Sequence, residues 1–462
     1  MSTEIKAKKH GFFNMKIDMV NGPLYKNFIL YMLPLFISSL VQQTYTAADM
    51  MILGQFAGDT AVAAVGATSS LVNLVVQLFM GVAVGYNIVL QRFYGAKNAQ
   101  KVKSVNSTAL IFALSIGVIM MVVGMIFTEP FLRLTNCPEE IVSDAALYAR
   151  IYFLSLPATM VYNHFTSLVK ASGDTVSGLM FIITSGVTNI GLNLFFVLVI
   201  GIPVAGVAIA TTVSIYVAAV LVFVKCVRIK GFGRLELRGI RFSFAIMGKF
   251  VKLGLPSSVS NTLSSLVAII SSSILNSFGP AVIAGNTAAN SVNTLLCSVL
   301  FALNSSATSF MTQNIGAGKR DNVIKIKRFA LALLTATSTV LAVVMFTLHE
   351  PLLLLYLPDA PDALSAASLR LLYFGVTMLM MGPAFMLTAI FSAYGKAAFQ
   401  MIRSLSMIAL NVLWLLVIYP VFPSLHTLFL YSPVSQGVSL LVSVIFERIY
   451  TARYLKGVEL TI

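Results

Sequence analysis

Residues 194–210 read LFFVLVIGIPVAGVAIA and lie in the middle of 175–224, a run of 50 residues with no charged side chain. A helix needs about 20 apolar residues to cross a bilayer, so this run is long enough for two crossings. Gly201-Ile202-Pro203 supplies the break between them. Only helices and closed barrels satisfy their backbone hydrogen bonds in lipid. Continuous apolar runs, unlike alternating ten-residue segments, favour helices, so the stretch predicts an all-α membrane protein.

The same pattern extends along the whole chain of 462 residues, of which 58% are apolar and only 10% are charged. A soluble domain carries about 25% charged residues. Two further uncharged runs, 253–318 and 404–446, are also long enough for two crossings each. The runs together predict twelve transmembrane helices, at 28–53, 61–90, 104–128, 146–169, 176–200, 204–226, 253–277, 282–311, 329–349, 367–392, 400–421 and 427–447.

The net charge of +15 follows the topology that these helices predict. Cytoplasmic loops of membrane proteins retain Lys and Arg. With a cytoplasmic N-terminus, the inner segments hold 28 of the 31 basic residues, and only Arg133, Arg150 and Arg370 fall outside. We therefore expect a multi-pass protein of the cell membrane with both termini in the cytoplasm. The basic charge needs no nucleic-acid partner to explain it.

The chain repeats itself after about 221 residues. Pro34 corresponds to Pro256, and Asn189 corresponds to Asn411. Six helices in each half predict two parallel six-helix repeats that face each other across a central cavity. Pro34 and Pro256 are predicted to kink their helices. The predicted segments are a cytoplasmic N-terminus (1–27), an N-lobe (28–226), a basic linker (227–252), a C-lobe (253–447) and a cytoplasmic tail (448–462).

Asp49 is the only carboxylate that lies inside a predicted helix and not at its end. Ser38, Gln42, Tyr45 and Asp49 are spaced by four, three and four residues, which places them on one helical stripe. A charge in mid-membrane costs about 2.5–3.5 kcal/mol or more, so it normally faces a bundle interior or a wet cavity. The alternative is an ordinary interfacial Asp, because Asp49 follows Lys26 by 23 residues, or about 34 Å of helix.

Polar residues on two other helices could partner that carboxylate. Ser185, Asn189 and Asn193 form one stripe, and Thr211 and Thr212 follow on the next predicted helix. Such residues can also serve simply to bond helices together. The chain contains no nucleotide-binding or metalloprotease motif, and its cysteines are too few for a metal cluster. These features predict neither an enzyme nor a protein with a cofactor.

Several local motifs, in order along the chain, resemble those of the multidrug and toxic compound extrusion (MATE) transporters. They are DMMILGQFAG from Asp49, ASGDT from Ala171, VTNIGLN from Val187, AGVAIATTVS from Ala205 and QNIGAG from Gln313. The resemblance covers essentially the whole chain. It implies a multidrug efflux antiporter that exports organic, often cationic, compounds in exchange for H⁺ or Na⁺ by alternating access.

The resemblance also implies a cation-binding cluster in the N-lobe. Its positions are Asp49, Tyr45, Asn163, Asn189, Asn193 and Thr211. Members of the family often carry a second Asp where this chain has Asn193. One carboxylate binds Na⁺ less strongly than two, whereas a single titrating group is enough for a proton. We therefore expect H⁺ as the coupling ion, with Na⁺ at Asp49 as the alternative.

Two other functions compete with this prediction. A lipid-linked oligosaccharide flippase of the related superfamily would line its cavity with several Lys or Arg for pyrophosphate, and no Lys or Arg lies well inside the predicted helices. A non-transporting membrane receptor would need neither the duplication nor a buried carboxylate. The expected partners are a small organic substrate and the lipid bilayer, and the chain is expected to be a monomer.

Overall fold

The computed structural model describes residues 16–134, 137–229, 231, 233–358 and 360–454, and these are helical for most of their length. The first bundle consists of α1 (Leu24–Phe56), α2 (Asp59–Gly95), α3 (Ala99–Leu134), α4 (Glu139–Phe153), α5 (Leu156–Ala171), α6 (Thr175–Leu194), the π-helix η2 (Phe195–Ile200) and α7 (Pro203–Arg228). The second consists of α8 (Phe244–Asn276), α9 (Pro280–Gly316), α10 (Arg320–Thr347), α11 (His349–Leu354), α12 (Pro361–Ala393), α13 (Ala397–Leu413), the π-helix η3 (Trp414–Ile418), α14 (Tyr419–Val421) and α15 (Leu425–Tyr454).

Eleven helical stretches of the described chain are long and apolar enough to cross a membrane. The predicted all-α fold with two lobes is therefore confirmed. The prediction of one continuous helix over 146–169 was wrong, because α4 and α5 follow each other with a break at Leu154 and Ser155. The proline two positions on, Pro157, has no backbone N–H to continue the helical ladder. The backbone N–H of Ser155 instead closes a tight turn on the carbonyl of Tyr152, at 2.8 Å.

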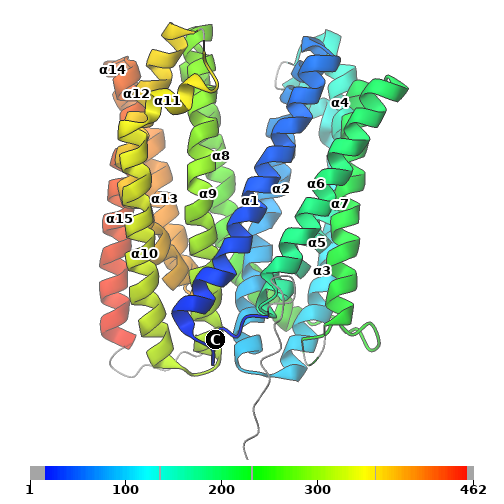
Figure 1. The fold of residues 1–462 in the computed structure, drawn as a ribbon, viewed down its shortest axis with the longest axis vertical. Helices are drawn as coiled ribbons and strands as arrows, with labels where there is room; N and C mark the ends of the chain where they lie inside the picture. The colour runs from blue at the N-terminus through cyan, green and yellow to red at the C-terminus, as the bar shows by residue number, and fades with distance from the viewer. Residues whose placement is uncertain (1–15, 135–136, 230, 232, 359, 455–462) are drawn as a thin grey trace, which may run out of the picture.

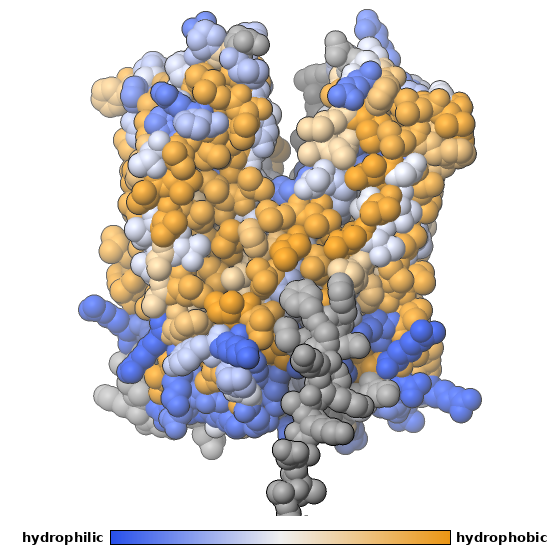
Figure 2. Space-filling view, viewed as in Figure 1, coloured by the Kyte–Doolittle hydropathy of each residue, from blue (hydrophilic) through white to orange (hydrophobic). Residues whose placement is uncertain are grey.

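The two bundles form a V (Figure 1). The space-filling view shows a hollow between them at one end and an apolar band below it (Figure 2). Hydrophilic side chains gather at the opposite end, where the loops and the basic residues lie (Figure 2). The cleft between the lobes therefore opens away from the basic side of the molecule.

The lobes meet closely at the basic end. A side chain at Gly95 would collide with the backbone of Gln313, and one at Gly316 would collide with the backbone of Arg92. Gly95 and Gly316 are 221 positions apart, and so are Arg92 and Gln313. The contact is thus reciprocal, as expected for two halves related by an approximate two-fold axis. Only glycine allows two helix backbones to approach in this way.

Polar bonds reinforce this contact between lobes. Gln313 donates to the side-chain oxygen of Gln91 at 2.6 Å, and Gln91 donates to Ser309 Oγ at 3.2 Å. The segment before α1 also joins the two lobes. The N–H of Ile17 bonds the carbonyl of Gly173, while Asn314 donates to the carbonyl of Met19 at 2.8 Å. These bonds close the basic end of the molecule.

Helix α1 passes from one lobe to the other (Figure 1). Near its start, the rings of Phe28 and Tyr31 pack on Phe310 of α9, with centroids 5.4 and 5.5 Å apart. Near its end, Ile52 and Leu53 belong to an N-lobe core cluster. Pro34 lies inside α1 and Pro256 inside α8, and both helices continue past the proline. The kinks and the exact lobe boundaries stay predictions, and α8 begins at Phe244 within the segment predicted as linker.

Candidate ion-coupling site and central cavity

Asp49 of α1 takes part in a chain of hydrogen bonds that crosses three helices. Asn193 of α6 donates through Nδ2 to Asp49 Oδ1 at 2.5 Å. The same Nδ2 lies 3.4 Å from Asn189 Oδ1, one turn earlier on α6. Asn189 in turn donates to Thr211 Oγ1 of α7 at 3.4 Å. Asn189 and Asn193 are fully buried, and Asp49 is half-buried.

Local sequence explains why these side chains meet. Residues four apart on a helix lie one above the other, so Asn189 and Asn193 face α1 and α7 together. Gly186 lies one turn below and gives α1 room to approach, because a Cβ there would come within 3.1 Å of the Tyr45 ring. Tyr45 therefore packs on α6 one turn before Asp49. The helix changes to the π form at Phe195, and π segments often occur at functional sites.

The interfacial alternative for Asp49 fits this geometry less well. Asp49 precedes the end of α1 at Phe56 by seven residues, or about 10 Å of helix. A buried amide donates to its carboxylate, whereas an interfacial Asp would be satisfied by water. The position favours a carboxylate that faces the bundle.

Neighbouring polar residues have other roles. Ser185 donates to the carbonyl of Ser214 at 2.8 Å, and Thr212 donates to the carbonyl of Ile151 at 3.0 Å. Both bonds join α-helices within the N-lobe and do not involve Asp49. Not every residue of the two polar stripes therefore belongs to the site.

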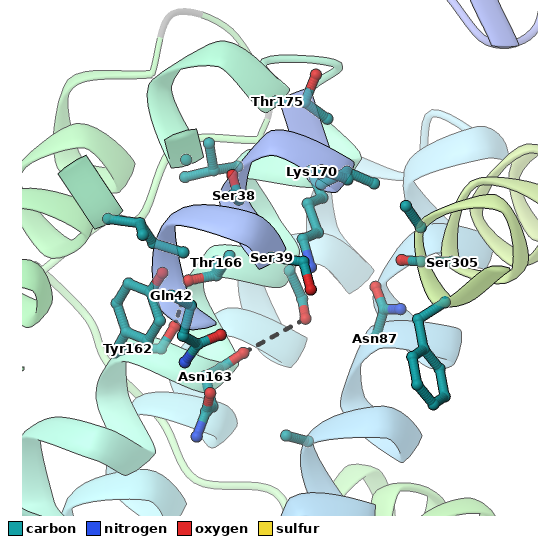
Figure 3. A pocket seen from close by; sticks show the side chains of 18 of the residues that line it. Ser38, Ser39, Gln42, Asn87, Tyr162, Asn163, Thr166, Lys170, Thr175 and Ser305 are labelled. Atoms are coloured by element: carbon teal, nitrogen blue, oxygen red, sulfur yellow. Dashed lines mark hydrogen bonds between the residues drawn. The ribbon is translucent and has the colours of Figure 1, made fainter. Parts of the chain in front are cut away.

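The structure does not place Asn163 in this chain of hydrogen bonds. Asn163 instead lines a cavity of about 400 Å³ between the lobes, together with Ser38 and Gln42 from the lower part of the α1 stripe. Helices α1, α2, α5, α6 and α9 contribute to its walls. The close-up shows the polar side chains that surround this space: Ser39, Gln42, Asn87, Asn163, Thr166, Lys170 and Ser305 (Figure 3).

Sequence reasoning missed Lys170. We expected no Lys or Arg well inside the predicted helices and assigned Lys170 to an inner loop, but α5 continues to Ala171 and Lys170 lines the cavity. The available signal was its spacing. Lys170 follows Asn163 and Thr166 by seven and four residues, which puts all three on one face of α5.

The oxygen atoms near Asp49 determine which ion they could hold. A sodium ion would draw on the Asp49 carboxylate, Thr211 Oγ1 and the amide oxygens of the two asparagines. Asn193, however, presents its amino group to Asp49, while its Oδ1 is buried with no hydrogen-bond partner among the described residues. No cluster of three His, Cys, Asp or Glu exists in the described part of the chain. The site thus offers one carboxylate among neutral amide and hydroxyl groups.

Comparisons with known proteins agree with this architecture. The MatE family model matches residues 34–195 and 256–417, one match in each lobe. The chain is 28% identical over 390 residues to the probable multidrug resistance protein YoeA of Bacillus subtilis, covering 83% of this chain and 84% of that protein. It is 22% identical over 403 residues to a FAD transporter of Shewanella oneidensis, covering 86% and 88%.

A solved structure described as the outward-facing conformation of a multidrug resistance MATE family transporter superposes with a TM-score of 0.86. It shares 19% sequence identity and covers 96% of this chain and 99% of that one, so it supports the fold alone. The family match covers most of both halves, including Asp49, Asn189 and Asn193. The chain therefore belongs to the MatE family of multidrug and toxic compound extrusion transporters.

Proposed function

We propose that this protein exports organic compounds from the cytoplasm in exchange for protons, with Asp49 as the group that carries the proton. The hydrogen-bonded chain from Asp49 to Thr211 is the observation that supports this best, since it puts one carboxylate beside neutral partners in the N-lobe. The protein works as a monomer in the cell membrane with both termini in the cytoplasm. It moves its substrate without making or breaking covalent bonds, so it is not an enzyme.

Asn193 suits both protonation states of Asp49. Its amino group donates to Asp49 in the structure, an arrangement that suits the ionised carboxylate. An amide also has an acceptor oxygen, and rotation of the Asn193 side chain would turn Oδ1 toward a protonated carboxyl group. That oxygen has no other partner among the described residues, so it gives up no hydrogen bond in the rotation, whereas Nδ2 gives up its 3.4 Å contact with Asn189 Oδ1. Asp49 would therefore keep Asn193 as a hydrogen-bond partner in both protonation states.

The V shape corresponds to one state of the transport cycle. By the distribution of basic residues, the closed end faces the cytoplasm and the cleft opens outward. A proton that reaches Asp49 from outside weakens substrate binding, and the substrate leaves through the open cleft. Return to an inward-facing state requires the bonds between Gln91, Ser309 and Gln313 to break as one lobe rocks against the other.

One proton provides enough driving force. Moving one charge through 100 mV yields about 2.3 kcal/mol, and each 1.4 kcal/mol supports about a tenfold gradient. Na⁺ remains the alternative coupling ion, although the single carboxylate argues against it. The resemblance implies a cationic compound, yet relatives include a multidrug resistance protein and a FAD transporter. Family membership alone therefore does not assign the substrate class.

The competing functions are less well supported. A flippase for a pyrophosphate-linked lipid would need several cations in its cavity, and among the described residues that line it only Lys170 is a cation. A receptor would not explain the reciprocal glycine contacts between two duplicated lobes.

Transport in proteoliposomes tests the proposal. Vesicles loaded at acid pH, with the membrane potential clamped, should accumulate a fluorescent organic dye in Na⁺-free buffer. A protonophore should abolish that accumulation, and protein-free vesicles give the background. Strict dependence on Na⁺ would reject the proton as coupling ion, and no accumulation of any dye would reject the export proposal.

A further inference from the structure

Lys170 gives the central cavity a positive charge. It is the next-to-last residue of α5, at the basic end of that helix, and its half-buried side chain extends into the space between Ser39, Asn87 and Asn163 (Figure 3). A basic residue that only followed the membrane topology would extend to the aqueous face. Lys170 instead lines the cavity that lies between the lobes.

The other charged residue of the cavity wall is already neutralised. Asp174 Oδ2 lies 2.6 Å from Lys225 Nζ and accepts a hydrogen bond from Ser177 Oγ at 2.9 Å. Asp174 Oδ1 accepts the backbone N–H of Ser177 at 3.0 Å. Lys170 Nζ, in contrast, makes no ion pair or hydrogen bond with any described residue. The cavity wall therefore holds one lysine amine with no acidic partner among the described residues.

The surroundings of Lys170 suit the anionic group of an organic molecule. Asn87, Asn163 and Ser305 offer neutral donors, from both lobes, for the oxygens of a carboxylate or phosphate. Met80 and Phe301 provide apolar wall for the rest of the molecule. A lysine binds phosphate or carboxylate as a point charge, and withdrawal from bulk water strengthens that attraction.

We propose that Lys170 and these neutral donors form a binding site for a carboxylate or phosphate group of the exported compound. Organic anions and zwitterions are then preferred over the purely cationic compounds that the resemblance implies. This inference rests on the proposed export function and narrows it to a substrate class.

The site is also connected to the contact between lobes. The hydroxyl of Tyr31 lies 3.3 Å from the backbone carbonyl of Lys170 and 3.2 Å from Ser309 Oγ of the C-lobe. Rocking of the lobes moves Ser309 relative to α5, so it changes the surroundings of the anion site. A substrate held at Lys170 is therefore exposed to the same rearrangement that opens the cytoplasmic end.

Equilibrium binding of two matched dyes tests the inference. Carboxyfluorescein is anionic and rhodamine 123 is cationic, and both share a xanthene ring. Each is titrated with purified full-length protein in phosphatidylcholine nanodiscs, and fluorescence anisotropy reports the Kd. Three variants are compared with the wild type: Lys170→Gln, Lys170→Arg, and Lys325→Gln as a control at an exposed lysine on α10.

Carboxyfluorescein should bind the wild type, Lys170→Arg and Lys325→Gln alike, and Lys170→Gln should raise its Kd about tenfold or more. Rhodamine 123 should bind Lys170→Gln at least as well as the wild type. The inference is overturned if the anionic dye does not bind, or if Lys170→Gln and Lys325→Gln weaken it equally. It is also overturned if phosphatidylglycerol added to the nanodiscs displaces the dye through Lys170, because the site would then hold a lipid headgroup.

The binding and transport measurements distinguish failure of the anion site from failure of the export proposal. The anisotropy measurement needs no pH gradient and no turnover. Binding that depends on Lys170 without proton-driven accumulation would leave the anion site standing and reject export. Proton-driven accumulation of rhodamine 123 alone, unaffected by Lys170→Gln, would keep export and reject the anion site.

Discussion

Replacement of Asp49 by Asn removes the proposed proton carrier with little change in shape. The carboxylate oxygen that accepts from Asn193 becomes an amide oxygen, so the 2.5 Å hydrogen bond has a direct substitute. A neutral amide is also cheaper than a charge inside a membrane protein. We therefore expect the Asp49→Asn variant to fold and to reach the membrane. The midpoint of its thermal unfolding should lie within a few degrees of the wild-type value.

The expected loss concerns coupling, and its size follows from the single carboxylate. With one proton per cycle and the potential clamped to zero, a pH difference of two units provides about 2.7 kcal/mol. That energy supports an accumulation of up to about 100-fold in the wild type. Asp49→Asn should reduce the accumulation ratio to about one, because no group remains to carry the proton.

The assay is dye uptake into acid-loaded proteoliposomes, with dye exchange between preloaded vesicles as the second readout. Exchange needs only binding and rocking, so Asp49→Asn should retain part of it. Asp362→Asn serves as the matched control, because Asp362 is exposed in the first turn of α12 and has no role in the proposed mechanism. Accumulation by Asp49→Asn at the wild-type ratio would falsify the assignment and leave Asp49 an interfacial residue.

Three further predictions concern the ion, the contact between lobes and the topology. Asn193→Asp restores the second carboxylate that the family often carries, and uptake should become stimulated by Na⁺ in a titration at constant pH; no stimulation would mean that residue 193 does not select the ion. Gly95→Leu places a side chain against the Gln313 backbone, so it should hold the cytoplasmic end apart and slow transport at least tenfold. Crosslinking of cysteines across that end should become slower, and unchanged crosslinking would contradict the role of the contact. The topology is tested in intact cells that express the protein without Cys137. A membrane-impermeant maleimide should label Leu355→Cys, after α11, but not Leu237→Cys, in the linker. The reverse labelling pattern would mean that the orientation is inverted.

The sequence predicted the features that depend on local composition. Uncharged runs identified most of the crossings, and Gly201-Ile202-Pro203 separates η2 from α7 as expected. The polar stripe that contains Asp49 could also be predicted, because helical spacing alone shows which residues share a face. A carboxylate inside a membrane helix costs free energy, so it is seldom present without a functional role. Asp49 alone therefore indicated where to expect a functional site.

Other features depend on contacts between distant segments and could not be predicted in this way. The break at Ser155 lies in an uncharged run, where counting charges shows nothing. Lys170 adjoins the end of a run and was therefore assigned to a loop, although α5 carries it into a cavity built by five helices. The passage of α1 from the C-lobe to the N-lobe is likewise a property of packing, since its sequence is apolar on both sides of Pro34.

The duplicated lobes share their packing but not their chemistry. Residues 222 positions after Asp49 and Asn193 are Ser271 and Leu415, so the C-lobe repeats neither the carboxylate nor its donor. It does repeat the amide, as Asn411, and a π-helix follows at η3 as one does at η2. Helix geometry and close glycine contacts are thus present in both halves, as the proposed rocking of the lobes requires. Because the proposed proton carrier exists in one half alone, we expect one coupled proton in each transport cycle.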